Sequence, residues 1–120
     1  MQLTQIHDVA VIRLSGELTI DYLNSLERLL SRLAHSQQTK ILLDMSQVDY
    51  LHYKIVYSMV ENALVFRLSN GDLKFLKLSG EARDVVRFVG AHQVIEDFDS
   101  LSEALLSFEM PHEEQRRVYH

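Results

Sequence analysis

The sequence predicts an α/β domain with a mostly parallel sheet and helices mainly on one face of that sheet. Stretches typical of strands alternate with longer stretches typical of helices, in the order β-β-α-β-α-β-α-β-α. A tight turn at His7-Asp8 joins the first two strands, so only the first strand is expected to run antiparallel. The continuous apolar run KILLDM (40–45) is typical of a central strand covered on both faces.

The first half of the chain is predicted to contain a hairpin, a helix and the central strand. In VAVIRLS, Ala10, Ile12 and Leu14 alternate with Val9, Val11 and Arg13, so the two sets line opposite sides of the strand. Gly16 is expected to end this strand, and Thr19 or Asp21 can cap the helix that follows. The apolar side chains of that helix recur every three or four residues, at Tyr22, Leu23, Leu26, Leu29, Leu30 and Leu33.

The second half is predicted to contain three more helices and two more strands. The helix after the central strand has an apolar stripe at Val56, Met59, Val60, Ala63 and Leu64, and Asn70-Gly71 supplies its left-handed C-terminal stop. DLKFLKL is a strand, and Ser79 can cap GEARDVVRFVG, which ends at Gly90. VIEDF is a last short strand, and Ser100 with Glu103 has the spacing of a capping box that opens a final helix through Leu105 and Phe108.

The composition is that of one globular domain that works outside the membrane. The 120 residues are 47% hydrophobic and 24% charged, with no cysteine, which excludes disulfides and thiolate metal sites. No apolar run reaches the roughly 18 residues of a membrane span, and MQLTQIHDVAVIRL lacks the features of a signal peptide, so we expect a cytoplasmic protein without direct membrane insertion. Pro111 separates the expected domain, 1–109, from a tail over 110–120 that is expected to be mobile.

The net charge of −5 argues against a nucleic-acid binder, which needs a basic face. We therefore expect a protein partner or a small ligand. No cofactor motif is present, and a homodimer is left open. The histidines are scattered without metal-ligand spacing, so no metal site is expected; they are His7, His35, His52, His92, His112 and His120. There is no Gly-x-Ser-x-Gly nucleophile motif, and we expect no catalytic activity.

Over roughly residues 2 to 108, the succession of elements resembles the STAS domain, the module of anti-sigma factor antagonists and of the cytosolic ends of sulfate transporters. VAVIRLSGELT resembles the second strand of the family and its Gly-Glu-Leu turn. Asp44-Met45-Ser46 and Val48-Asp49-Tyr50-Leu51 occupy the Asp-Leu-Ser and Val-x-Phe-Ile positions of the central strand. The segment from Asn70 to Leu105 resembles the remainder.

The resemblance breaks immediately after Leu51. In regulatory STAS proteins the next residues read Asp-Ser-Ser-Gly, and a partner kinase phosphorylates a serine there. Here His52 occupies the aspartate position, Tyr53 and Lys54 replace the serines, and Ile55 replaces the glycine. Lysine has no hydroxyl to receive a phosphate, and its charge is opposite to that of phosphoserine. The resemblance thus implies a STAS scaffold without the serine phosphorylation switch, with Lys54 at the usual serine position.

The start of this helix is predicted to carry positive charge. Backbone N–H groups at a helix start attract anions, and Lys54 with a protonatable His52 adds to that attraction. One hypothesis is that this end receives a carboxylate or phosphate from a partner. The alternative is that Lys54 simply points into solvent.

Two tyrosines add a second feature to the same helix. Tyr53 and Tyr57 are four residues apart and share a helix face outside the predicted stripe, which indicates an exposed contact patch beside Lys54. The alternative is that Tyr57 packs beneath the segment 19–22. If the strands are parallel, the turn with Glu17, Thr19 and Asp21, the strand exit at Ser46, and the loop with Ser79 and Glu81 leave the same edge of the sheet. That edge is the predicted partner-binding surface.

These observations predict a non-catalytic regulatory adaptor in bacterial signalling. By resemblance, the partner is an anti-sigma-type kinase or another signalling component. Some standalone STAS proteins that lack the serine resemble accessory subunits of membrane transport ATPases, which is the first alternative. The second alternative is a STAS module that binds a nucleotide.

Overall fold

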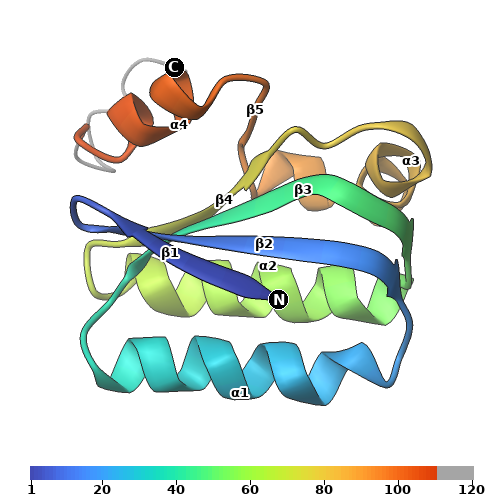
Figure 1. Cartoon of the computed structure of the whole chain (residues 1–120), viewed down its shortest axis with the longest axis horizontal. Helices are drawn as coiled ribbons and strands as arrows, with labels where there is room; N and C mark the ends of the chain where they lie inside the picture. The colour runs from blue at the N-terminus through green and yellow to red at the C-terminus, as the bar shows by residue number, and fades with distance from the viewer. Residues whose placement is uncertain (111–120) are drawn as a thin grey trace.

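The computed structural model describes residues 1–110 and contains one five-stranded sheet with the spatial order β1-β2-β3-β4-β5 (Figure 1). The strands are β1 (Gln2–Ile6), β2 (Val9–Leu18), β3 (Lys40–Leu51), β4 (Asp72–Leu76) and β5 (Asp97–Phe98). β1 runs antiparallel to β2, and all other neighbours are parallel. The predicted mostly parallel sheet with one antiparallel strand is confirmed.

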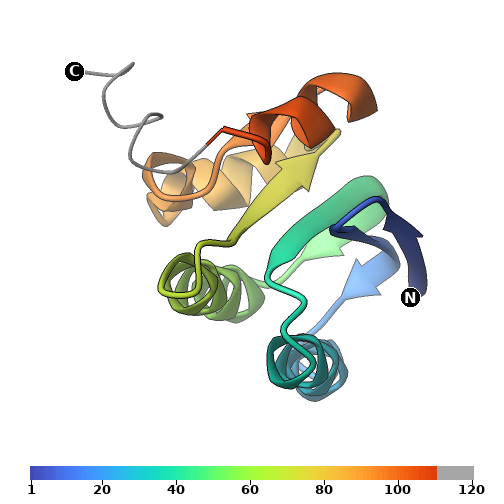
Figure 2. The ribbon, with the colours of Figure 1, turned by 90° about the vertical axis from the view of Figure 1, so that its left-hand side faces the viewer.

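The helices lie on both faces of the sheet, but unequally. They are α1 (Tyr22–His35), α2 (Tyr53–Arg67), α3 (Gly80–Phe88), the 3-10 helix η1 (Ala91–Gln93) and α4 (Leu101–Ser107). Because each parallel crossover advances in the same direction, the right-handed rule sends successive helices to the same face. Figures 1 and 2 show α1 and α2 side by side below the sheet and α4 on the other side.

The core has two parts because β3 is covered on both faces. The larger part lies between the sheet and α1, α2 and α3, and it contains Ala10, Ile12 and Leu14. The smaller part lies beneath α4 and contains Val9, Leu42, Leu76, Ala104 and Phe108. The side assignment predicted for VAVIRLS is therefore correct, and so is the prediction that KILLDM is buried on both faces.

α4 covers a buried lysine. The Lys74 side chain is inaccessible to solvent, and its Nζ donates to Ser107 Oγ at 2.9 Å and lies 3.5 Å from Glu96 Oε1. The ammonium also lies over the Phe108 ring, 4.7 Å from its centre. Burial lowers the pKa of Lys74, and the Glu96 carboxylate opposes that shift.

Two predicted strand ends were wrong. Gly16 does not end β2, because its backbone takes φ +79 in a bulge and the strand continues to Leu18. β3 likewise runs beyond residue 45 to Leu51, paired with β2 through Leu18↔Leu51. Since β3 pairs with β4 only as far as Asp44↔Leu76, the ends of β2 and β3 form a two-stranded extension beyond β4. We call residues 15–18 and 47–51 the β2–β3 arm.

The last predicted strand is shorter than expected. The first residues of VIEDF are not part of the strand. Ile95 is buried in the larger core beside η1. Only Asp97 and Phe98 pair, with Phe75 and Leu76 of β4.

The predicted helix ends and stripes are only partly correct. Ser100 accepts from the Glu103 N–H as the capping box requires, whereas Asp21 and Ser79 occupy N-cap positions without a side-chain capping bond. In α2, Leu64 is exposed and Phe66 is buried in its place, together with Ile55, Val56, Met59 and Ala63.

The predicted stop at Asn70-Gly71 divides into two different roles. Asn70 takes the left-handed conformation, with φ +61. Gly71 does not, but a Cβ at that position would lie 1.9 Å from the Thr39 carbonyl oxygen. Only glycine therefore allows this close approach of two backbones.

The mobile tail expected over 110–120 lies, beyond Met110, outside the described residues. Within residues 1–110, no helix combines the length and apolarity needed to cross a bilayer.

Candidate functional site

The β2–β3 arm positions the start of α2. Leu18 and Leu51 are paired at the end of the arm, and both side chains are buried. The His52 N–H then donates to the Leu18 carbonyl at 2.9 Å, which ties the helix entry to the end of β2. The first turn of α2 therefore lies at the tip of a supported extension rather than on a loop.

His52 caps α2. It has extended backbone angles, φ −72 and ψ 136, and its Nδ1 accepts the backbone N–H of Lys54 at 3.1 Å. This is the bond that Ser, Asp or Asn makes at most helix starts. A ring nitrogen that accepts carries no proton, so a doubly protonated His52 cannot make this cap. The imidazole thereby replaces the carboxylate expected at this family position.

Lys54 is exposed at the same helix tip. Among residues 1–110 no carboxylate pairs with its ammonium. Its backbone N–H is already taken by His52, so an anion from a partner would meet the Lys54 charge more directly than free backbone groups. The anion-receiving role stays a prediction.

Aromatic rings continue from His52 along one side of α2. The His52 and Tyr53 rings stack with centres 4.7 Å apart, and the Tyr53 and Tyr57 rings meet edge to face at 6.0 Å. Tyr53 and Tyr57 are 48% and 49% exposed, so neither belongs to the core. Aromatic side chains held against one another but half open to solvent suit contact with another protein, because little rotamer freedom remains to be lost.

The tyrosines form one wall of a cleft between α2 and α3. The cleft has a volume of about 560 Å³, and its lining is mostly apolar. The residues that line it, which we call the aromatic cleft, are Tyr50, Leu51, Tyr53, Tyr57, Asp84, Val85, Phe88 and Val89. Phe88 is 90% exposed, an unusual position for a phenyl ring without a partner. Asp84 is the single carboxylate in the lining. The cleft can receive an apolar side chain beside a cationic one.

The other predicted site residues do not line this cleft. Glu17 is exposed near the end of the β2–β3 arm, and Thr19 and Asp21 are exposed in the connection to α1. Ser46 is exposed on β3 where the pairing with β4 has ended. Ser79 and Glu81 are exposed at the start of α3, whereas the cleft is lined by the later residues of that helix. The roles of these six residues stay predictions.

Asp44 binds Ser46 and Arg13 at an irregular part of the β2–β3 pairing. Asp44 Oδ1 accepts the Ser46 N–H at 3.0 Å, and Oδ2 accepts from Arg13 Nε at 3.2 Å. Burial alone would raise the pKa of Asp44, but the hydrogen bonds from Ser46 and Arg13 outweigh burial and hold it below its ordinary value. A register shift between Arg13 and Ser15 lies at the same place.

Residue patterning alone missed the α3 wall of the cleft. Asp84, Val85, Phe88 and Val89 all belong to the predicted helix GEARDVVRFVG. Its buried residues, Ala82 and Val86, are four apart. Phe88 is off that stripe, so the periodicity contained a signal for an outward-facing aromatic residue. Within residues 1–110, no group of three or more histidine or acidic side chains gathers as a metal site.

The comparisons with known proteins agree with this fold. The model of the STAS domain family matches residues 1–104 of this chain. The chain therefore belongs to the STAS domain family. No curated protein matches it closely enough to be reported. The domain boundary expected at residue 109 stays a prediction.

Solved structures of anti-sigma factor antagonists have the same fold. A putative anti-sigma factor antagonist from Thermotoga maritima has a TM-score of 0.83 at 16% identity, over 91% of this chain and 94% of that chain. An anti-sigma factor antagonist from Mycobacterium paratuberculosis has a TM-score of 0.81 at 16% identity, over 91% and 92%. The phosphorylated form of the Bacillus cell fate determinant SpoIIAA has a TM-score of 0.68 at 22% identity, over 87% and 95%.

Proposed function

We propose that this STAS protein is a non-catalytic regulatory adaptor that binds a protein partner through the aromatic cleft and the adjoining start of α2. The supporting observation is the exposure of Tyr53, Tyr57 and Phe88 around one mostly apolar cleft. Exposed aromatic side chains grouped on a soluble domain are typical of an interface centre. By its family, the partner is an anti-sigma-type kinase or another component of bacterial signalling, and the adaptor works in the cytoplasm.

We further propose that binding is not controlled by serine phosphorylation at this site. Lys54 occupies the family's serine position, and the preceding aspartate position is filled by His52, which caps the helix. Ser58 lies one turn later, is buried, and donates to Glu27 at 3.1 Å, so it does not offer a kinase an accessible hydroxyl. SpoIIAA has a phosphorylated form, and our proposal is that this chain is not phosphorylated at the corresponding position.

Incubation with the cognate kinase and ATP, followed by intact-mass measurement, tests the absence of the switch. We expect the mass to remain that of the unmodified chain. Addition of one phosphate per chain would contradict the proposal, and peptide mapping would then identify the modified residue.

Charge reversal at the helix tip tests the role of Lys54. We expect Lys54→Glu to reduce partner recovery in pull-down, because a partner carboxylate or phosphate would meet an acidic group of the same sign. Lys54→Ala should reduce it less. If both variants recover the partner as well as the parent chain does, the tip does not receive an anion. The identity of the recovered protein, a sigma-factor regulator or a transport ATPase subunit, separates the adaptor from its first alternative.

A further inference from the structure

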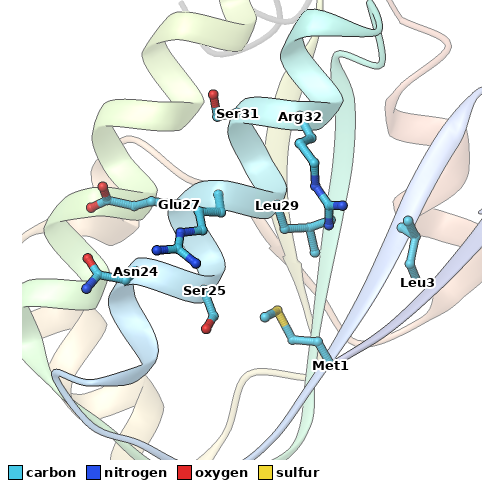
Figure 3. Close-up of a pocket in the computed structure, with 9 residues that line it drawn as sticks. Met1, Leu3, Asn24, Ser25, Glu27, Leu29, Ser31 and Arg32 are labelled. Atoms are coloured by element: carbon cyan, nitrogen blue, oxygen red, sulfur yellow. The ribbon is translucent and has the colours of Figure 1, made fainter.

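A second groove lies between β1 and α1, away from the aromatic cleft. Its volume is about 1050 Å³, and both apolar and polar side chains line it. Figure 3 shows Leu29 and Arg32 projecting from α1 toward the side where Met1 and Leu3 of the opposite wall lie. Met1 and Leu3 are 47% and 50% exposed, so the sheet edge is not covered by α1.

The upper wall of this groove is an unprotected sheet edge. β1 is the first strand of the sheet and, within residues 1–110, pairs only with β2. Soluble proteins usually guard such an edge with charged residues, proline or a bulge. The strand sequence QLTQI contains no charged residue and no proline, and its register with β2 has no bulge. Its outer backbone groups are therefore available to another strand.

The lower wall carries unbalanced positive charge. Arg28 and Arg32 line the groove, and within residues 1–110 no carboxylate lies at ion-pair distance from either. The one acidic residue in the lining, Glu27, accepts from Ser58 of α2. In Figure 3, Glu27 points away from Met1 and Leu3. The groove is thus cationic although the whole chain has a net charge of −5.

We propose that this groove binds an acidic, extended segment of a partner protein, which adds to β1 as a further strand. Arg28 and Arg32 are one helical turn apart, so their Cβ atoms are separated by about 6 Å. Alternate residues on one face of a strand repeat every ~6.7 Å. Two acidic residues at alternate positions can therefore reach both guanidinium groups, while their methylene groups lie against Leu3 and Leu29.

Charge also selects between this occupant and a second copy of the chain. Antiparallel pairing of two β1 edges would bring a second Arg28 and Arg32 pair to the same groove, so like charges would face one another. An acidic strand from a different protein compensates those charges. This surface is distinct from the aromatic cleft, so the proposal does not depend on the proposed function.

A synthetic peptide of alternating threonine and glutamate, seven residues long and blocked at both ends, tests the proposal. Titration is followed by amide NMR shifts. We expect perturbations at β1 and at the groove face of α1, and affinity that falls as salt is raised. The Arg28→Glu/Arg32→Glu variant should bind about tenfold more weakly. Arg87→Glu, which reverses an exposed charge on α3, should bind like the parent chain.

Two control peptides and one hydrodynamic measurement make the test decisive. A threonine–lysine peptide should not bind, and a threonine–glutamate peptide with N-methyl groups on its inner residues should lose the β1 perturbations, because it lacks strand N–H donors. Equal binding of the lysine or N-methyl peptide would overturn the proposal. A dimer found by light scattering, with amide NMR signals of β1 broadened and the dimer mass unchanged by the glutamate peptide, would also overturn it. A second copy of the chain would then be the occupant.

Discussion

His52 explains why α2 can begin with residues that are poor helix starters. The macrodipole disfavours a cation at this end, and the first turn contains Lys54 and no acidic residue. The imidazole compensates by accepting the Lys54 N–H, and the backbone N–H of His52 donates to the Leu18 carbonyl at the end of the β2–β3 arm. His52, which is not a preferred capping residue, thus caps α2 and also connects the helix to the sheet.

Removal of this cap should be measurable. We predict that His52→Ala lowers the free energy of unfolding by about 1 kcal/mol, whereas His52→Asn retains most of the stability because its side-chain oxygen can accept the same N–H. Urea denaturation of the three proteins at pH 8 provides the measurement. Equal losses in both variants would mean that the ring contributes by stacking on Tyr53 rather than by capping.

Asp44 gives a prediction for acid stability. The pKa of Asp44 is lower in the folded chain than in the unfolded chain, where it is near 3.8. The stability that the ionised carboxylate contributes is therefore fully present above pH 3.8, and it is lost as the pH falls through the lower pKa of the folded chain. We predict that Asp44→Asn costs about 1–2 kcal/mol at pH 7 and that the difference from the parent chain shrinks below pH 4. Urea denaturation across pH 2–7 measures this. A difference that does not change with pH would exclude the ionised carboxylate as its source.

Gly71 gives a prediction about a close backbone approach. A Cβ there would overlap the Thr39 carbonyl, so Gly71→Ala must displace the connection between α1 and β3. We predict a loss of about 2–3 kcal/mol, in the upper part of the range for overpacking. Gly16→Ala, where φ is positive but nothing lies near the added Cβ, should cost about 1 kcal/mol from backbone strain alone. Thermal or urea unfolding of both variants compares them, and equal losses would contradict the overlap.

At the scale of elements, α4 is attached to the sheet by a buried charge. Burying an ammonium is costly even when it is partly paired, and replacement by an apolar side chain of similar volume is often neutral or stabilising. We therefore expect Lys74 to determine where α4 packs on the sheet rather than to increase the stability of the fold.

We predict that Lys74→Met raises the free energy of unfolding at pH 7 by about 1 kcal/mol, because it removes the desolvation penalty and keeps the contact with Phe108. The folded pKa of Lys74 is lowered, so the unfolded chain binds more protons and the stability of the parent chain rises with pH toward 10.5. The stability advantage of Lys74→Met over the parent chain should therefore narrow as the pH rises from 7 toward 10.5. Urea denaturation at each pH measures the free energy of unfolding of both proteins. If the two curves of free energy against pH run parallel, burial does not lower the pKa of Lys74.

Sequence patterns predicted the elements better than their ends. The alternation of Ala10, Ile12 and Leu14 with Val9 and Val11 correctly assigned both faces of β2, because burial repeats with the strand period. The continuation of β2 past Gly16 was not predictable in the same way. It depends on pairing with residues 47–51, about thirty positions away, and glycine in a strand marks a bulge as readily as an end.

The candidate site shows the same division. Tyr53 and Tyr57 could be placed together from their spacing, because they share one helix. Phe88 and Asp84 come from another helix, and only the packing of α3 beside α2 brings them to the same cleft. The capping role of His52 was also missed, because capping preferences rank Ser, Thr, Asp and Asn first.

At the scale of the whole molecule, the domain offers two surfaces of different character. The aromatic cleft is mostly apolar with one carboxylate, and the groove beside β1 is lined by two arginines that have no carboxylate partner within residues 1–110. Two separate surfaces would allow an adaptor to hold two proteins at once. The STAS fold supplies the scaffold, and we propose that the residues that differ from the phosphorylated family pattern determine how it is used.

The most direct test of the central claim is partner recovery by an aromatic-cleft variant. Tyr53→Ala/Phe88→Ala removes two exposed rings and should leave the fold intact, and Leu106→Ala removes an exposed apolar side chain from α4 as a matched control. We predict that the double variant recovers at least about tenfold less of the partner identified by mass spectrometry, with or without prior kinase treatment, while the control recovers it fully. Undiminished recovery by the double variant, or recovery that depends on phosphorylation of the chain, would contradict the account.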